Sequence, residues 1–279
     1  MAKNELGKSV VIVSKKMAYN PFNPNNRVFG VEDVEKVLSR HKCAFKVRHA
    51  EIFQTAMVHS SYVKRKEYTT PTGETTQLSA KPADCLDLFD DSYERLEHLG
   101  DSVLGAVTAT YLMTRFPQEQ EGFLTDLKKE IVCNEMLGQL SQKIGLDAFY
   151  IISRHNEDIC MGRTNLKKLG DIFEAFIGAL WTDSDNDFKL VSGFIVAMIE
   201  MYIDIPKILM NNRNFKEQFQ KVFQSIHHTT PTYQMVSFEN GLYTMNVMDS
   251  TNILGTGKAS TKKQAEQWAA REALATWRL

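Results

Sequence analysis

The sequence predicts a mainly α-helical domain followed by a small α+β domain with the element order α-β-β-β-α. Apolar residues repeat at helical spacing through most of the chain between Val31 and Tyr202. After residue 213 the pattern changes to three short strand-like runs between two amphipathic segments, with an Asn-Gly pair between the first two runs. No apolar run reaches the roughly 18 residues that indicate a membrane span, so we expect no membrane partner.

The composition is that of an ordinary globular protein, 43% hydrophobic and 24% charged. Residues 212–279 hold 8 Lys and Arg against 5 Asp and Glu, whereas residues 1–211 hold 25 against 29. An acidic body with a mildly basic tail domain fits a metal-dependent core joined to a nucleic-acid binder. The four cysteines are scattered without a CxxC pair, so we expect free thiols rather than a zinc site, and a reducing, cytoplasmic compartment.

The domain boundaries follow from turn-rich stretches. Residues 1–28, which contain the segment NPFNPNN, are interpreted as an N-terminal extension rather than a domain, and its packing against the core is left open. The first domain is expected at 29–205, with an inserted loop at 64–91 that is rich first in Thr, Ser and Pro and then in acids. A linker at 206–213 begins with a proline and leads to the second domain at 214–279.

The stretch SYERLEHLGDSVL, residues 92–104, predicts an amphipathic helix with an unusual acidic face. Glu94, Glu97 and Asp101 occur at i, i+3 and i+7 and therefore share one side of the helix. Like charges four residues apart destabilise a helix by roughly 0.2–0.5 kcal/mol per pair, so an offsetting interaction is expected. A solvated acidic face is the alternative interpretation.

A second stretch, LGDIFEAFIGALW at residues 169–181, is apolar nearly all round and predicts a buried helix. It nevertheless carries Asp171 and Glu174, with no Lys or Arg inside the run. Buried, unpaired carboxylates cost several kcal/mol, unless a cation binds them. We therefore expect the two helices to pack together and to pool Glu97, Asp101, Asp171 and Glu174 into one site for Mg²⁺, with Mn²⁺ as a substitute.

The remaining helices of the first domain have recognisable limits. Asp91 or Ser92 is expected to cap the first acidic helix, which should end near Arg115 before a proline. Helical spacing continues from residue 124 to 140 and predicts one core helix there. A last apolar helix is expected at 188–202.

The second domain is predicted to contain two helices and three strands. An amphipathic helix is expected at 214–226, and a hairpin should turn near Asn240 and Gly241. A third strand is expected at 252–259, and the segment from Lys262 to Trp277 is a strong helix former.

The two acidic stretches resemble a known enzyme family. ERLEHLGDSVLG resembles the signature of the ribonuclease III family, and LGDIFEAFIGALW resembles its second catalytic helix, in the Dicer-type version with Gly170. The resemblance implies that the four pooled carboxylates are the catalytic and metal-binding residues. It also implies that Glu94 lies near the catalytic valley and the dimer seam. His98 replaces the usual Phe that plugs the partner subunit in bacterial relatives.

The C-terminal stretch GTGKASTKKQAEQWAA resembles the signature of double-stranded-RNA-binding domains. These domains read the shape of the duplex rather than its sequence. The loop ENGLY, residues 239–243, lacks the Gly-Pro-x-His of that family, so the resemblance does not extend to the minor-groove contact of that loop. The alternative interpretation of Lys262 and Lys263 is that they are ordinary surface charges with no RNA contact. The RNA-binding residues expected from the resemblance are Lys216, Gln220, Ser260, Thr261, Lys262 and Lys263.

Together the two resemblances imply a homodimeric endoribonuclease that cleaves double-stranded RNA. The products expected from the family are 5′-phosphate and 3′-hydroxyl ends with short 3′ overhangs, and Lys167 or Lys168 is a candidate contact to the scissile phosphate. A viral suppressor of RNA silencing is one candidate role. The alternative is a protein that keeps the fold and sequesters double-stranded RNA without cutting it.

Overall fold

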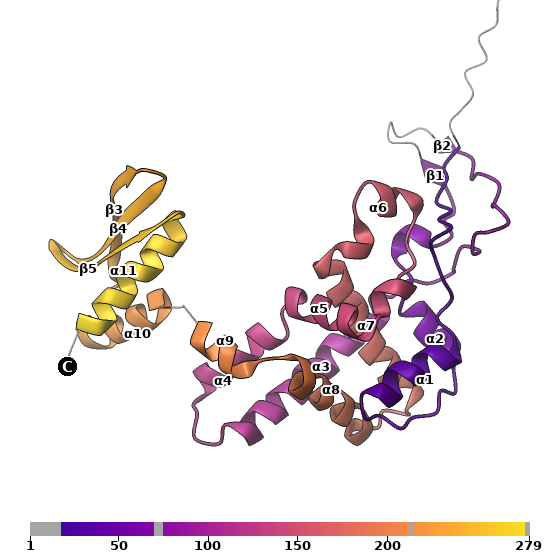
Figure 1. The fold of residues 1–279 in the computed structure, drawn as a ribbon, viewed down its shortest axis with the longest axis horizontal. Helices are drawn as coiled ribbons and strands as arrows, with labels where there is room; N and C mark the ends of the chain where they lie inside the picture. Colours follow the sequence, from indigo (N-terminus) through magenta and orange to yellow (C-terminus); the bar gives the residue numbers. More distant parts are fainter. Residues whose placement is uncertain (1–17, 70–74, 212–214, 277–279) are drawn as a thin grey trace, which may run out of the picture. The chain divides into compact units, whose positions relative to one another are not determined.

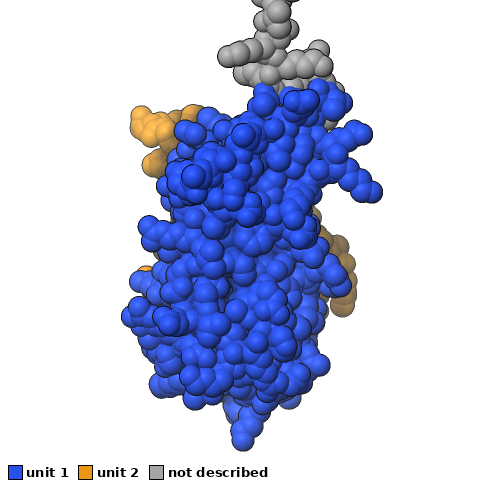
Figure 2. Space-filling model, turned by 90° about the vertical axis from the view of Figure 1, so that its right-hand side faces the viewer, with its two compact units in different colours: residues 1–203 blue, residues 204–279 orange. Residues whose placement is uncertain are grey.

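The computed structural model describes residues 18–69, 75–211 and 215–276. Contacts divide the chain into two compact units, residues 1–203 and residues 204–279, which Figure 2 shows in separate colours. The first unit is helical apart from two very short strands, and the second combines helices with a three-stranded sheet (Figure 1). The predicted order of a mainly α domain and an α+β domain is confirmed.

The first unit is built from helices that surround one central helix. Two-residue strands, β1 (Tyr68–Thr69) and β2 (Thr75–Thr76), lie within the inserted segment. The helices are α1 (Val31–Arg40), α2 (Ala50–Thr55), α3 (Glu94–Arg115), α4 (Glu121–Ile131), α5 (Asn134–Ile144), α6 (Arg154–Asp158), α7 (Leu166–Asp183) and α8 (Phe188–Tyr202), with short 3₁₀ turns at Ser60–Tyr62, Leu146–Phe149 and Gly162–Thr164.

Helix α7 is the central helix, because it is apolar on nearly every side and buries most of its residues. The ring of Phe176 packs against the rings of Phe29, Phe53 and Phe194, which come from three separate segments. Asp171 lies on the same helix and is only 5% exposed. The core packing therefore carries a carboxylate inside the unit, where it needs hydrogen bonds or a charged partner.

Helices α3 and α7 cross where two glycines leave no side chain between them. A Cβ atom added to Gly100 would lie 1.8 Å from the carbonyl oxygen of Glu174, and one added to Gly178 would lie 2.2 Å from that of Leu96. Only glycine permits backbones to approach this closely. The crossing brings the acidic face of α3 against the acidic stretch of α7.

The start of α3 differs from the sequence-based prediction. The helix begins at Glu94 with Tyr93 in the N-cap position, and no side chain caps it. Neither Asp91 nor Ser92 has the predicted capping role. The amide of Tyr93 donates to the carbonyl oxygen of Val58 at 2.8 Å, because the chain enters the helix from the core rather than from solvent.

The stretch at 124–140 forms two helices, and the prediction of one continuous helix is wrong. Helix α4 ends at Ile131, and Cys133 is extended at φ −72° and ψ 148° before α5 begins. The break turns the chain so that α5 packs closely on α7, where a Cβ atom on Gly138 would lie 2.2 Å from the carbonyl oxygen of Leu166. Apolar spacing is nearly continuous across the break and does not reveal it.

The described part of the segment before α1 packs on the first unit. Phe22 is buried, and the side-chain amides of Asn23 and Asn26 donate to the carbonyl oxygen of Ile152 at 3.2 and 3.0 Å. These contacts involve the part of the predicted extension that is described. Residues 1–17 of it lie outside the described residues.

The inserted segment at 64–91 pairs with that same N-terminal segment. The amide of Tyr19 donates to the carbonyl oxygen of Gln77, and the amide of Ser79 donates to that of Tyr19, both at 2.9 Å. The rings of Tyr19 and Tyr68 stack with centroids 5.1 Å apart. The insertion is therefore partly strand, held by long-range pairing that its composition does not predict; its residues 70–74 lie outside the described part.

The second unit has the predicted α-β-β-β-α order preceded by one extra helix. Its antiparallel strands lie in the order β3-β4-β5. The turn falls at Asn240 and Gly241, which have φ values of 51° and 75°, as predicted. Pro206, in the predicted linker, lies in the first turn of a helix, where its missing N–H is tolerated. The elements are α9 (Ile205–Asn211), α10 (Phe215–His227), β3 (Thr232–Glu239), β4 (Leu242–Asp249), β5 (Asn252–Ala259) and α11 (Lys262–Thr276).

Helix α11 lies directly on the sheet because small residues face each other. A Cβ atom on Gly257 would lie 2.1 Å from the carbonyl oxygen of Ala265. Phe219 and Phe223 of α10 fill the core of this unit together with Val247 of β4. Throughout the part of the chain that the structure describes, no helix has both the length and the apolar character needed to cross a membrane.

Candidate active site

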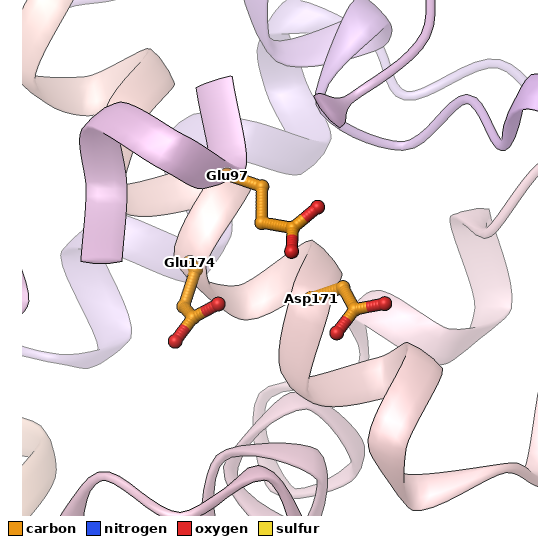
Figure 3. Close-up of side chains that lie close together, drawn as sticks. All are labelled: Glu97, Asp171 and Glu174. Atoms are coloured by element: carbon orange, nitrogen blue, oxygen red, sulfur yellow. The ribbon is translucent and has the colours of Figure 1, made fainter. Parts of the chain in front are cut away.

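Three of the four predicted carboxylates form one group at the α3–α7 crossing. Glu97 comes from α3, and Asp171 and Glu174 come from successive turns of α7, as Figure 3 shows. One oxygen from each lies within 4.8 Å of the others. Asp101 is exposed, one turn after Glu97, and lines the same cavity. The structure therefore brings the four predicted residues to one place, with Asp101 at its edge.

The carboxylates line an open cavity of about 530 Å³. Its wall is formed by the start of α3, the start of α5 and the first turns of α7. The cavity is polar, and acidic side chains outnumber basic ones along its wall. Its lining residues are Tyr93, Glu94, Glu97, His98, Asp101, Asn134, Lys167, Lys168, Asp171 and Glu174.

Glu174 carries the strongest sign of crowded negative charge. Burial, followed by the nearby carboxylates of Asp101, Glu97 and Asp171, raises the pKa of Glu174 to about 8. Burial also raises the pKa of Glu97, with Asp171 as the next largest cause. In the described part of the chain Glu174 forms no ion pair. The carboxylates of the group therefore lie close enough together to favour the protonated form of Glu174.

Asp171 differs from the prediction, because it is not unpaired. The ammonium of Lys168 lies 3.2 Å from its Oδ2, and the hydroxyl of Tyr93 donates to the same oxygen at 3.1 Å. The side-chain amide of Asn134 donates to Oδ1 at 3.4 Å. Lys168 stands just before the apolar run, three residues from Asp171, so the expectation based on the run itself missed it.

Tyr93 and Asn134 are site residues that the sequence did not point to. Each begins an element, since Tyr93 is the N-cap residue of α3 and Asn134 is the first residue of α5. Burial raises the pKa of Tyr93 far above its usual range, so its hydroxyl keeps its proton and donates it in hydrogen bonds. A signal for Asn134 would have required knowledge of the break between α4 and α5.

The other predicted residues of the first unit lie at the rim. Glu94 and His98 are exposed and line the cavity, and Lys167 lines it as well. His59 is the N-cap residue of a 3₁₀ turn, and its Nδ1 accepts a hydrogen bond from the amide of Ser61 at 3.0 Å. His59 therefore has a local structural contact.

The predicted RNA-binding residues of the second unit fall into two sets. Ser260, Thr261, Lys262 and Lys263 are exposed at the start of α11, where free amides and the helix dipole attract anions. Lys216 instead pairs with Glu266 at 2.6 Å, and its ammonium lies 4.4 Å from the ring centroid of Tyr233. Gln220 is half-buried on α10. The start of α11 is therefore the open basic surface.

Two family models match the chain. The model described as "Ribonuclease III domain" matches residues 94–185, and the model described as "Double-stranded RNA binding motif" matches residues 215–276. The first match contains the whole carboxylate group, and the second contains the β-sheet and α11.

Several known proteins are similar to this chain. A ribonuclease 3 of Staphylococcus epidermidis is 36% identical over 184 residues, which cover 64% of this chain and 74% of the relative. A probable ribonuclease 3 of Acanthamoeba polyphaga mimivirus is 27% identical over 93% of this chain, which spans only 48% of that relative. A solved ribonuclease III nuclease domain from Campylobacter jejuni is 23% identical with a TM-score of 0.49, and the match covers 62% of this chain and 99% of that chain.

Proposed function

Because the chain belongs to the ribonuclease III family of endoribonucleases, we propose that it cleaves double-stranded RNA with the help of divalent metal ions. One observation carries the proposal above the others. Three carboxylates lie within 4.8 Å of one another, and burial together with the neighbouring carboxylates raises the pKa of Glu174 to about 8. Lys168 pairs with Asp171, but in the described part of the chain no cationic side chain forms an ion pair with Glu97 or Glu174.

The donor set fits Mg²⁺ or Mn²⁺. Both ions prefer oxygen ligands, and Mg²⁺ is usually held by one or two carboxylates together with waters and phosphate oxygens. We propose that Glu97, Asp101, Asp171 and Glu174 hold the metal, with Asp101 reaching it from the exposed edge. When bound, divalent ions supply a deprotonated water at neutral pH and stabilise charge on the departing oxygen.

The protein side chains would orient the RNA and the carboxylates. Lys167 faces the cavity and would contact a phosphate oxygen of the scissile linkage. Tyr93 and Asn134 hold Asp171 from opposite oxygens, which fixes the direction of its carboxylate. The products proposed from the family are 5′-phosphate and 3′-hydroxyl ends with short 3′ overhangs.

The second unit would hold the duplex by its backbone. The exposed start of α11, with Lys262 and Lys263, supplies charge and free amides for phosphates. Since Lys216 is engaged with Glu266, its contact to RNA would require that ion pair to open. We expect RNA affinity to depend mainly on the start of α11.

Two strands of a duplex require two cuts, and one unit has a single carboxylate group, so we propose a homodimer with one group for each strand. Glu94 and His98 are exposed beside the cavity, where a partner subunit could contact them. Light scattering of the full chain at pH 6 and pH 8 tests both the dimer and any effect of His98. A monomer at both pH values and micromolar concentration would contradict the dimer.

Glu174→Ala tests the proposed activity. Wild type is expected to cut a long duplex RNA in Mg²⁺, whereas Glu174→Ala is expected to bind the duplex with unchanged affinity and to cut it at least a hundredfold more slowly. Gel electrophoresis of products and a filter-binding assay measure the two properties. If wild type binds and does not cut, the chain is an RNA-sequestering protein with a nuclease fold.

The biological role remains a separate proposal. The similarity to a mimivirus protein supports a viral setting, and suppression of RNA silencing inside the host cell is the role we propose there. Expression in cells that carry a silenced reporter measures it: wild type should restore the reporter, and Glu174→Ala should restore it less.

A further inference from the structure

We propose that Lys168 is a built-in counter-ion of Asp171, and that a divalent cation displaces it when the cation binds the group of Glu97, Asp171 and Glu174. The inference rests on the metal site of the proposed function and assigns control of that site to one lysine. Lys168 is thereby a positioning residue that sets how tightly the ion is held.

The contacts of Lys168 place its ammonium at the buried carboxylate. Nζ lies 3.2 Å from Oδ2 of Asp171 and 3.4 Å from the hydroxyl oxygen of Tyr93. The Tyr93 hydroxyl donates to that same Oδ2 at 3.1 Å. The side chain of Asp171 is 8% exposed and that of Lys168 is 39% exposed, so the pair joins a buried carboxylate to a partly exposed ammonium, and both residues line the cavity.

The position of Lys168 in its helix does not explain its presence. It lies in the first turn of α7, where its amide donates to the side-chain oxygen of Asn165. Cations in the first turn are unfavourable because the helix dipole is positive there. The compensating interaction is Asp171, one turn further along. The lysine therefore serves the carboxylate group rather than the helix.

A metal ion and Lys168 compete for one carboxylate. Asn134 already donates to Oδ1 of Asp171, and Lys168 and Tyr93 occupy Oδ2. A doubly charged ion bound to Asp171 would lie close to the Lys168 ammonium, which is at hydrogen-bond distance from the same carboxylate. The ion and the ammonium therefore repel each other. The ion therefore replaces the ammonium, which is then free to face the cavity beside Lys167, where an RNA phosphate would enter.

Lys167 provides a matched control. It is one residue away on the same turn of α7 and lines the same cavity, so its removal changes the net charge of the site by the same amount. In the described part of the molecule, Lys167 forms no ion pair with Asp171. A difference in metal affinity between the Lys168 and Lys167 variants therefore measures the direct contact with Asp171. A change in affinity that both variants share measures the loss of one positive charge from the cavity.

The experiment is calorimetric titration of the full chain with Mn²⁺ at constant pH and salt, for wild type, Lys168→Gln, Lys167→Gln and Lys168→Arg. Lys168→Gln is expected to bind Mn²⁺ about tenfold more tightly than wild type, because a charge in contact with the ligand is removed. Lys167→Gln is expected to change affinity by roughly twofold, since its charge is farther from Asp171. Lys168→Arg, which keeps the charge, should stay close to wild type.

Metal-free melting temperatures give a second readout. Lys168→Gln should melt several degrees below Lys167→Gln without metal, and saturating Mn²⁺ should remove that difference. Equal or weaker Mn²⁺ binding by Lys168→Gln, or equal effects of the two glutamine variants, would overturn the inference. Absence of Mn²⁺ binding by wild type would instead show that the proposed metal site itself is wrong.

Discussion

Replacing Gly100 by alanine should separate the two halves of the carboxylate group. The added methyl carbon would lie 1.8 Å from the carbonyl oxygen of Glu174 and 2.9 Å from the amide nitrogen of Gly178. An ordinary contact needs about 3.4 Å. Helices α3 and α7 must therefore move apart by roughly 1.5 Å, since both obstacles are backbone atoms that cannot rotate away.

The expected loss can be separated into stability and activity. Overpacking of this kind costs about 1–3 kcal/mol, against which an alanine in a helix gains about 1 kcal/mol over glycine. The free energy of unfolding should therefore fall by about 0–2 kcal/mol. Displacement of catalytic groups by 1 Å can cost a hundredfold in rate, so cleavage should fall by about that factor or more.

Gly105→Ala is the matched control, because it makes the same substitution in the same helix. There the methyl group would lie 3.3 Å from Nζ of Lys128, the movable end of a flexible, half-buried side chain. We expect unchanged cleavage and a small gain in stability. Urea unfolding and single-turnover cleavage at saturating Mg²⁺ measure both variants. Full activity of Gly100→Ala would refute the view that this contact sets the spacing of the carboxylates.

Two further predictions concern pH and RNA binding. The pKa of Glu174 is raised to about 8 in the folded state, above its usual 4.5, so the folded protein holds this proton more tightly than the unfolded chain does. Without metal, the free energy of unfolding should therefore fall by about 2–4 kcal/mol as pH rises from 4.5 to about 8, after allowance for solvent screening. Melting curves recorded with EDTA at pH 5–9 measure this loss. Alanine at both Lys262 and Lys263 should lower the slope of log affinity against log salt by roughly one for each lysine, measured by fluorescence anisotropy of a labelled duplex.

Each of these has a control within the same chain. Glu174→Gln removes the titrating group and should flatten the pH dependence, whereas a steep dependence in that variant would assign the effect to another residue. Lys221→Ala, on the ion-paired surface of α10, should leave the salt slope near that of wild type. An unchanged slope in the double lysine variant would exclude the start of α11 as a phosphate contact.

Local patterns predicted those parts of the structure that depend on neighbouring residues. Helix α3 ends at Arg115 because Pro117 follows, and the Asn240–Gly241 turn requires positive φ at two successive residues. The helical spacing also placed Glu97 and Asp101 on one face of α3. The acidic and apolar patterns of α3 and α7 also indicated that the two helices pack together. The patterns did not indicate how closely the two helices approach each other.

Contacts between segments that are distant in the chain could not be predicted from the sequence. Whether Lys168 turns toward Asp171 or toward solvent depends on the position of Tyr93, which is 75 residues away in the chain. The break before Asn134 is set by the packing of α5 on α7, because the apolar spacing alone would allow one helix. Each of these features requires two distant segments to be placed before either can be interpreted.

The pairing of Tyr19 with the inserted segment has an evolutionary consequence. Each segment satisfies backbone donors and acceptors of the other at Tyr19, Gln77 and Ser79. A homologue that shortened the insertion would leave the N-terminal segment without its hydrogen-bond partners, and the reverse also holds. The two segments should therefore be gained and lost as a pair across related enzymes, although some 60 residues separate them in the sequence.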